Sequence, residues 1–230
     1  MRNRFPEKFL PCGKLLACVV FSGISLIAFA DTYTDAEIAY RNGQYSKAFH
    51  FFQLAAKEGN KDALYNLGHM HLQGKGTQQN LTEARNCFLQ AAQKADPGAQ
   101  YQLGNLYYYG YGIPKDCQTA YKWYMKAAGQ HYTPALYALG TLHEEGCGVS
   151  KNPYKATMRF RQAAERGDAR AQYQIGYRYF TGYGSRRDRD KAYEWLARAA
   201  EQNNQTALDF LEKYFRTRQN GKETYPVNDS

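Results

Sequence analysis

The chain has 230 residues, a formal net charge of +9 at pH 7 and 21 tyrosines. Its N-terminal apolar run, residues 15–29, is shorter than the roughly 20 residues that span a bilayer, which argues against a membrane-spanning protein. The positive charge favours anionic partners, whether acidic proteins, envelope polysaccharide or lipid headgroups, and identifies none of them.

The N-terminal segment predicts a secretory signal peptide. Four basic residues precede the apolar run, and Ala28-Phe29-Ala30 ends it before the polar Asp31. Cleavage between Ala30 and Asp31 removes four basic residues and one acid, so the mature chain keeps a net charge of +6. The alternative is a membrane anchor. With cleavage, no stable membrane span remains, and we expect a periplasmic or secreted protein.

The next segment, residues 31–60, predicts a short helical hairpin with one glycine turn at Gly43. Ala48 and Phe52 lie 36 residues before Ala84 and Phe88, so the hairpin shares the register of the units that follow it. Terminal units of a repeat array are usually atypical because one of their faces meets water.

From residue 61 onward the chain repeats every 36 residues. A hydrophobic-glycine step recurs four times, as Leu67-Gly68, Leu103-Gly104, Leu139-Gly140 and Ile175-Gly176. Two loop glycines follow each step, in the pairs Gly74/Gly76, Gly110/Gly112, Gly146/Gly148 and Gly182/Gly184. Apolar residues lie at helical spacing on both sides of each loop, so each unit predicts two helices. A fixed period of this size predicts an α-solenoid, in which stacked units bury their apolar faces together.

We expect the four regular units at residues 61–97, 98–133, 134–169 and 170–205. Residues 206–216 then predict a capping helix, because Ala207 and Leu211 keep the register while Glu212 replaces the glycine. Residues 217–230 are polar and contain Gly221 and Pro226, so we expect a flexible tail.

The strings that repeat resemble a known family. The residues Ala99–Gly104, then Gly110–Ile113, then Lys122–Ala128 are similar to the Sel-1-like repeat, a relative of the tetratricopeptide repeat. The first hairpin resembles an ordinary tetratricopeptide unit. This resemblance implies an all-α fold, a right-handed α-solenoid, that holds other proteins together and is not an enzyme.

Three cysteines follow the predicted cleavage site: Cys87, Cys117 and Cys147. Loops of neighbouring units stack side by side, so Cys117 with Cys147 is the pair that we propose for a disulfide in an oxidising compartment. The disulfide-rich branch of the family pairs cysteines seven residues apart. Alanines occupy those positions here, so the penicillin-related activity reported for members of that branch is in doubt for this chain.

Metal and catalytic sites have little support. His69 and His71 are two residues apart in one helix and point in different directions, and His71 and His143 share a repeat position with two tyrosines. No nucleophile motif, phosphate-binding loop or pair of catalytic carboxylates is evident, and Glu144-Glu145 suggests surface charge. We therefore expect no metal, no cofactor and no catalysis.

A basic cluster surrounds the last loop, comprising Arg178, Arg186, Arg187, Arg189 and Lys191. We interpret it as a solvated loop with internal pairing to Asp188 and Asp190. Export also argues against nucleic acid as a partner.

Tyrosines mark the candidate binding surface. One tyrosine column recurs at the 36-residue period, and the resemblance implies that the first helices, which carry it, line a concave groove. The candidate partner-binding residues are Tyr101, Asn105, Tyr108, Tyr109, Tyr137, Tyr173, Tyr177 and Phe180. Tyrosine provides a large contact area at low entropic cost, as peptide capture requires. Packing within the repeat framework is the competing interpretation.

Two functions remain open. The first is an exported scaffold that binds a protein or peptide in its groove, in envelope assembly or host contact. The alternative is an envelope-glycan or β-lactam-binding module with weak hydrolase activity. The sequence does not identify the partner or the oligomeric state.

Overall fold

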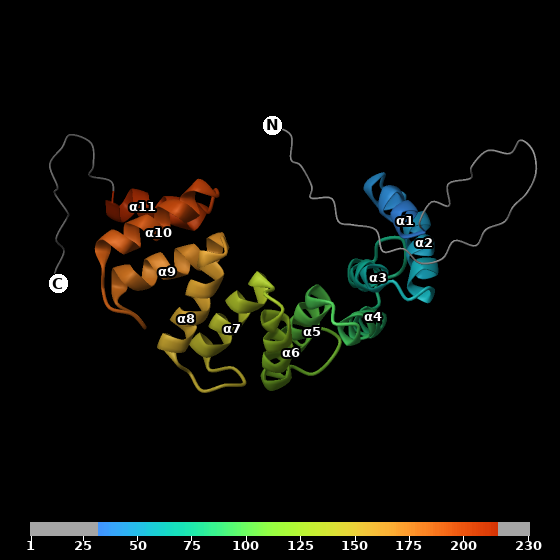
Figure 1. Ribbon diagram of the computed structural model, residues 1–230, viewed down its shortest axis with the longest axis horizontal. Helices are drawn as coiled ribbons and strands as arrows, with labels where there is room; N and C mark the ends of the chain where they lie inside the picture. The colour runs from blue at the N-terminus through green and yellow to red at the C-terminus, as the bar shows by residue number, and fades with distance from the viewer. Residues whose placement is uncertain (1–31, 216–230) are drawn as a thin grey trace, which may run out of the picture. The chain divides into compact units, whose positions relative to one another are not determined.

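The computed structural model describes residues 32–215, and the predicted signal peptide, its Ala30–Asp31 cleavage site and the predicted tail lie outside this range. Within it the chain folds into helices alone, without strands (Figure 1). The helices are α1 Thr32–Arg41, α2 Tyr45–Lys57, α3 Lys61–Gln73, α4 Leu81–Gln93, α5 Pro97–Tyr109, α6 Cys117–Gly129, α7 Thr133–Glu145, α8 Pro153–Glu165, α9 Ala169–Thr181, α10 Arg189–Glu201 and α11 Gln205–Phe215.

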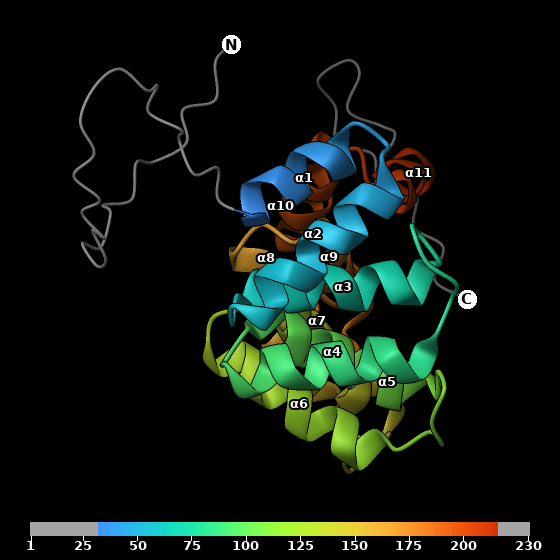
Figure 2. The same cartoon turned by 90° about the vertical axis from the view of Figure 1, so that its right-hand side faces the viewer.

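Each helix packs against the next one along the chain, as Figures 1 and 2 show for α3, α4, α5 and α6. Odd-numbered and even-numbered helices are therefore the first and second helices of successive units. The predicted all-α solenoid with a 36-residue period is confirmed.

Side-chain caps start the second helices of the regular units. Asn80 accepts hydrogen bonds from the backbone N–H groups of Thr82 and Glu83 at the start of α4. The equivalent caps of α6, α8 and α10 are Asp116, Asn152 and Asp188. Such caps satisfy backbone donors that have no partner inside the helix.

The glycine of the hydrophobic-glycine step allows close approach between the two helices of a unit. A Cβ at Gly104 would collide with the ring of Tyr124 on α6, and the rings of Phe88 and Phe160 occupy the same place beside Gly68 and Gly140. Glycine at this position lets a buried side chain of the second helix rest directly on the backbone of the first.

The two loop glycines have different roles, which the third regular unit illustrates. Gly146 ends α7 in the left-handed conformation, with φ of 78°. A Cβ at Gly148 would collide with the backbone of Cys117, at the start of the preceding second helix. The second glycine thus brings each loop against the preceding unit, which places Cys147 beside Cys117.

Arg178 corrects one prediction from the sequence. Expected in a solvated cluster, it is buried in α9, at 1% exposure, and its Nη2 lies 2.5 Å from Oε1 of Glu144 on α7. Its guanidinium also lies 5.0 Å from the ring centroid of Phe160. The position belongs to the column of Met70, Leu106 and Leu142, so the solenoid core here contains an ion pair instead of an aliphatic side chain.

Candidate functional site

An open cleft of about 240 Å³ lies on the first helices of the second, third and fourth regular units. It lies between the rings of α5 and α7 and the beginning of α9. Its lining residues are Tyr101, Asn105, Tyr108, Tyr109, Tyr124, Tyr137, Ala138, Thr141 and Arg170. We call it the tyrosine cleft.

The floor of the cleft is fixed by a buried hydroxyl. The Tyr124 Oη donates a hydrogen bond to Asn105 Oδ1 at 2.8 Å, and Asn105 Nδ2 donates to Gln102 Oε1 at 3.0 Å. Burial raises the pKa of Tyr124, so it stays a neutral donor. Phenylalanine occupies the equivalent position in the two neighbouring units. The tyrosine hydroxyl therefore orients the Asn105 amide within the cleft.

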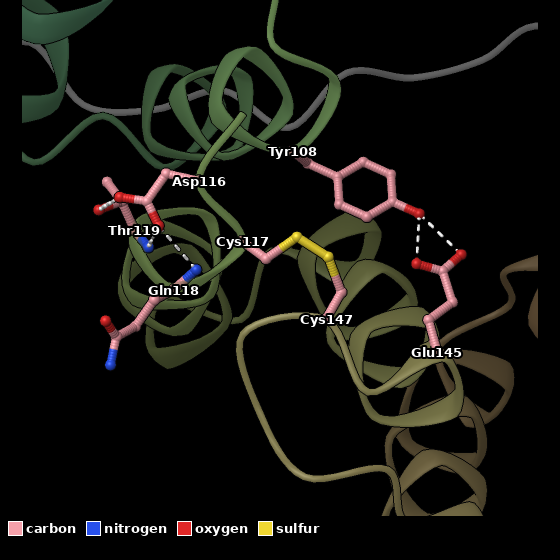
Figure 3. The surroundings of a disulfide bond; sticks show 7 residues. All are labelled: Tyr108, Asp116, Cys117, Gln118, Thr119, Glu145 and Cys147. Carbon is pink, nitrogen blue, oxygen red and sulfur yellow. Dashed lines mark hydrogen bonds between the residues drawn. A yellow bond between two sulfur atoms is a disulfide. The ribbon is translucent and has the colours of Figure 1, made fainter. Parts of the chain in front are cut away.

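One wall depends on a contact between two units. The Tyr108 Oη, on α5, lies 2.8 and 2.7 Å from the two carboxylate oxygens of Glu145 on α7 (Figure 3). Burial, and then the hydrogen bond to Glu145, raise the pKa of Tyr108, which keeps the phenol protonated at neutral pH. Glu145, expected as surface charge, thus fixes the orientation of a cleft side chain.

The opposite wall combines an aromatic ring with a cation. The guanidinium carbon of Arg170 lies 4.4 Å from the ring centroid of Tyr137. The Nη2 of Arg170 also lies 2.8 Å from Oδ2 of Asp168, the N-cap residue of α9. Arg170 is the one charged residue among those that line the cleft. Stacking and ion pairing hold this guanidinium in place.

Tyr109 provides the open edge of the cleft. Its side chain is 58% exposed. It stacks on Tyr111, with ring centroids 5.3 Å apart, and meets the ring of Tyr108 edge-on at 4.7 Å. These neighbours support an aromatic surface that a ligand can reach from solvent.

The structure brings five of the eight candidate residues together in the cleft: Tyr101, Asn105, Tyr108, Tyr109 and Tyr137. The other three, Tyr173, Tyr177 and Phe180, contact Phe210 of α11 through their rings. They therefore pack against the last helix of the described chain, apart from the cleft.

Sequence reasoning missed Tyr124, Ala138 and Arg170 as lining residues. The remaining lining residue, Thr141, shares the repeat position of the candidates Asn105 and Tyr177. Tyr124 belongs to a column of buried phenylalanines, and its hydroxyl was the available signal. Arg170 carried no such signal, because its contact with Tyr137 depends on where α9 begins in space.

A disulfide joins Cys117 and Cys147 beside the Tyr108–Glu145 contact (Figure 3). Their Cα atoms are 5.3 Å apart, within the usual range for this bond. It links the start of α6 to the loop that follows α7, and so ties together two units that both contribute to the cleft. Cys87 is a free thiol whose pKa burial raises to about 11, which makes it unreactive.

The histidines of the described range do not form a metal site. His71 meets Phe49 edge-on at 5.1 Å, and His143 meets Tyr121 edge-on at 5.9 Å, so both pack as framework rings. Residues 32–215 contain no group of three His, Cys, Asp or Glu side chains placed to hold a metal ion. None of the helices in this range is long and apolar enough to cross a membrane.

Comparisons with known proteins extend the resemblance noted in the sequence. The family model for the Sel1 repeat matches residues 38–60, 61–96, 97–132, 133–168 and 169–204. No curated protein matches the chain. Among solved structures, a Sel1 repeat protein from Oxalobacter formigenes is 32% identical with a TM-score of 0.78, and the match covers 85% of this chain and 83% of that one.

Two further structures are similar. Protein c5321, a protective antigen of uropathogenic Escherichia coli strains, is 28% identical with a TM-score of 0.72; the match covers 79% of this chain but 41% of c5321, less than half its length. A putative Sel1 repeat protein from Klebsiella pneumoniae, 21% identical with a TM-score of 0.54, shares the fold over 79% of this chain and 90% of its own. With five consecutive matches to the family model, the chain belongs to the Sel1 repeat family.

Proposed function

We propose that the chain is an exported, non-catalytic scaffold that binds a protein or peptide partner in the tyrosine cleft. Sel1 repeat proteins are generally scaffolds for protein interactions. The cleft suits this role because tyrosine and arginine, which line it, are among the residue types enriched in binding hot spots.

The main support for the proposal is that contacts within the protein already order the side chains of the cleft. Tyr108 is held by Glu145, Asn105 by Tyr124, and Arg170 by Asp168, while Tyr109 remains more than half exposed. A binding surface that is ordered before the partner arrives loses little side-chain entropy on binding. The cleft therefore combines ordered polar groups with an accessible aromatic anchor, as a peptide site requires.

The test compares two exposed tyrosines. Tyr109→Ala removes the aromatic anchor, whereas Tyr154→Ala removes a tyrosine that is 71% exposed on α8, outside the cleft. We expect Tyr109→Ala to weaken the affinity for the partner by at least about 30-fold, because hot-spot residues contribute about 2 kcal/mol or more to the binding free energy. The measurement is a crosslinking pull-down from the producing cell, followed by titration of the partner recovered. Equal recovery by both variants would contradict the proposal.

Export to the periplasm or beyond is a further part of the proposal. The leader pattern at residues 1–30 supports it, and so does the Cys117–Cys147 disulfide, since disulfides persist in oxidising compartments. N-terminal sequencing of the protein from fractionated cells tests it. We expect a mature chain that begins at Asp31 in the periplasmic or secreted fraction; an uncleaved chain with reduced cysteines in the cytosol would refute export.

The stacked pair Tyr109 and Tyr111 favours a second candidate, an envelope glycan, because two neighbouring exposed rings offer flat apolar faces to a sugar. Retention on purified peptidoglycan that is lost in Tyr111→Ala would support it. We do not extend this candidate to β-lactam hydrolysis, since no serine, cysteine or histidine lines the cleft.

A further inference from the structure

Two consecutive second helices carry an excess of positive charge. In its 13 residues α6 contains Lys122 and Lys126 and no acid. The 13 residues of α8 contain three bases, Lys155, Arg159 and Arg161, and one acid, Glu165. None of these five cations forms an ion pair within the described range. The second helices on either side, α4 and α10, contain equal numbers of acids and bases.

The charged positions of the two helices form one surface. The Nη2 of Arg159, on α8, lies 3.9 Å from the Met125 sulfur on α6. Just beyond the helices, Nη2 of Arg166 lies 3.2 Å from Nδ1 of His131. Arg159 thus reaches across to α6, whereas Arg161 donates from Nη2 to the Tyr179 hydroxyl on α9 at 2.9 Å.

Apolar side chains lie among these cations. Met158 is 59% exposed on α8, and Met125 is 38% exposed on α6. Tyr154, Met158 and Arg161 lie at i, i+4 and i+7, and hence on one stripe of α8. On α6, Met125 and Lys126 lie three and four residues after Lys122, so both are its neighbours on the helix surface. The exposed stripe of each helix is therefore both basic and apolar.

We propose that this basic face of α6 and α8 binds the surface of an anionic lipid bilayer. Anionic headgroups attract lysine and arginine over about one Debye length, while the interface accepts methionine and tyrosine side chains below the headgroups. Lysine and arginine can keep their charges in water while their aliphatic stems contact lipid. A free polyanion would match the charges but would leave the two methionines in water. The proposal is independent of what binds in the tyrosine cleft.

Cosedimentation of the purified protein with vesicles tests the proposal. We expect binding to vesicles of phosphatidylglycerol mixed with phosphatidylcholine, weakening as salt is added, and no binding to phosphatidylcholine alone. Lys122→Gln/Lys155→Gln should weaken binding by about 25-fold, or about fivefold for each charge removed near the surface. The control Lys57→Gln/Lys61→Gln removes the same charge from α2 and α3 and should change binding less than about twofold. Met158→Ser should also weaken binding, because it removes apolar contact while the charge is unchanged.

Equal weakening in the two double variants would overturn the proposal, because net charge and not this face would then govern binding. Unchanged binding of Met158→Ser would overturn it as well. So would retention of the protein on heparin or DNA without any binding to anionic vesicles. Circular dichroism of each variant confirms that the helices are intact, and all the substituted side chains are exposed.

Discussion

At the scale of single residues, the contact between Gly104 and Tyr124 is one of the tight steric constraints on the central units. Alanine at this position would collide with the buried ring. We expect Gly104→Ala to lower the free energy of unfolding by about 1–3 kcal/mol, the usual cost of overpacking. Gly129→Ala is the matched control, because no atom lies within 4 Å of its Cβ and alanine favours helix. Urea unfolding measures both; equal effects would contradict this explanation of the repeated glycine.

The side chain of His143 predicts a loss of stability in acid. Burial lowers its pKa from the ordinary 6.5, and its Nδ1 is buried without a hydrogen-bond partner. His143 therefore binds a proton more readily in the unfolded chain than in the folded one. Its contribution to the free energy of unfolding is complete above pH 6.5 and decreases as pH falls through the folded pKa. We expect the melting temperature to fall between pH 7.5 and pH 5, and to fall less in His143→Tyr. Tyr107 and Tyr179 show that tyrosine fits this repeat position.

Single residues also show what the sequence could predict. Tyr108 and Tyr109 are candidates because they are additional to the tyrosine that recurs in every regular unit, and both line the cleft. The charge of Arg178 predicts a solvent-exposed side chain, whereas the period assigns it to a column of buried aliphatic residues, and the structure follows the period. Arg170 was beyond reach of the sequence, since stacking on Tyr137 depends on the angle between successive units.

At the scale of elements, the Cys117–Cys147 disulfide joins one helix to the loop of the next unit. The two cysteines are 30 residues apart, and closing a loop of this length in the unfolded chain stabilises the fold by about 2–4 kcal/mol. We therefore expect reductant to lower the melting temperature of the wild type. Reductant should change the melting temperature of Cys117→Ala/Cys147→Ala very little, because the cysteine that this variant keeps, Cys87, forms no disulfide. An equal response of both proteins to reductant would contradict this role.

The ring of Phe210 on α11, the final helix within residues 32–215, packs against the first helix of the preceding unit. Phe210 meets the ring of Phe180 edge-on at 5.1 Å and the ring of Tyr177 at 6.0 Å. We expect Phe210→Ala to destabilise the protein by about 2 kcal/mol, because a half-buried ring loses part of the full cost of truncation. Leu208→Ala, at an exposed position of the same helix, should have a smaller effect. Thermal unfolding distinguishes them, and equal losses would argue against a capping role.

At the scale of the whole molecule, the 36-residue period predicted the architecture because each unit repeats the same packing contacts between its helices and loops. The hydrophobic-glycine step, the capped second helix and the two-glycine loop recur every 36 residues, so local rules specify the whole array. The cleft could be predicted only in part. It is formed where the repeats differ from one another, through Tyr124 in place of phenylalanine and Arg170 at the start of α9.

The described chain also presents its two candidate surfaces on different sets of helices. First helices supply all but one of the residues that line the tyrosine cleft, whereas second helices carry the basic face. A scaffold with this arrangement can bind a protein partner in the tyrosine cleft while its basic face binds an anionic bilayer.

Site-specific photocrosslinking in the producing cell tests the proposal that a partner binds in the tyrosine cleft. A photoreactive amino acid replaces Tyr109 in one version of the protein and Tyr154, on α8, in the other. We expect a single discrete protein adduct from position 109 and none from position 154. The same protein adduct from both positions, or no adduct from position 109 beside an intact fold, would contradict the claim.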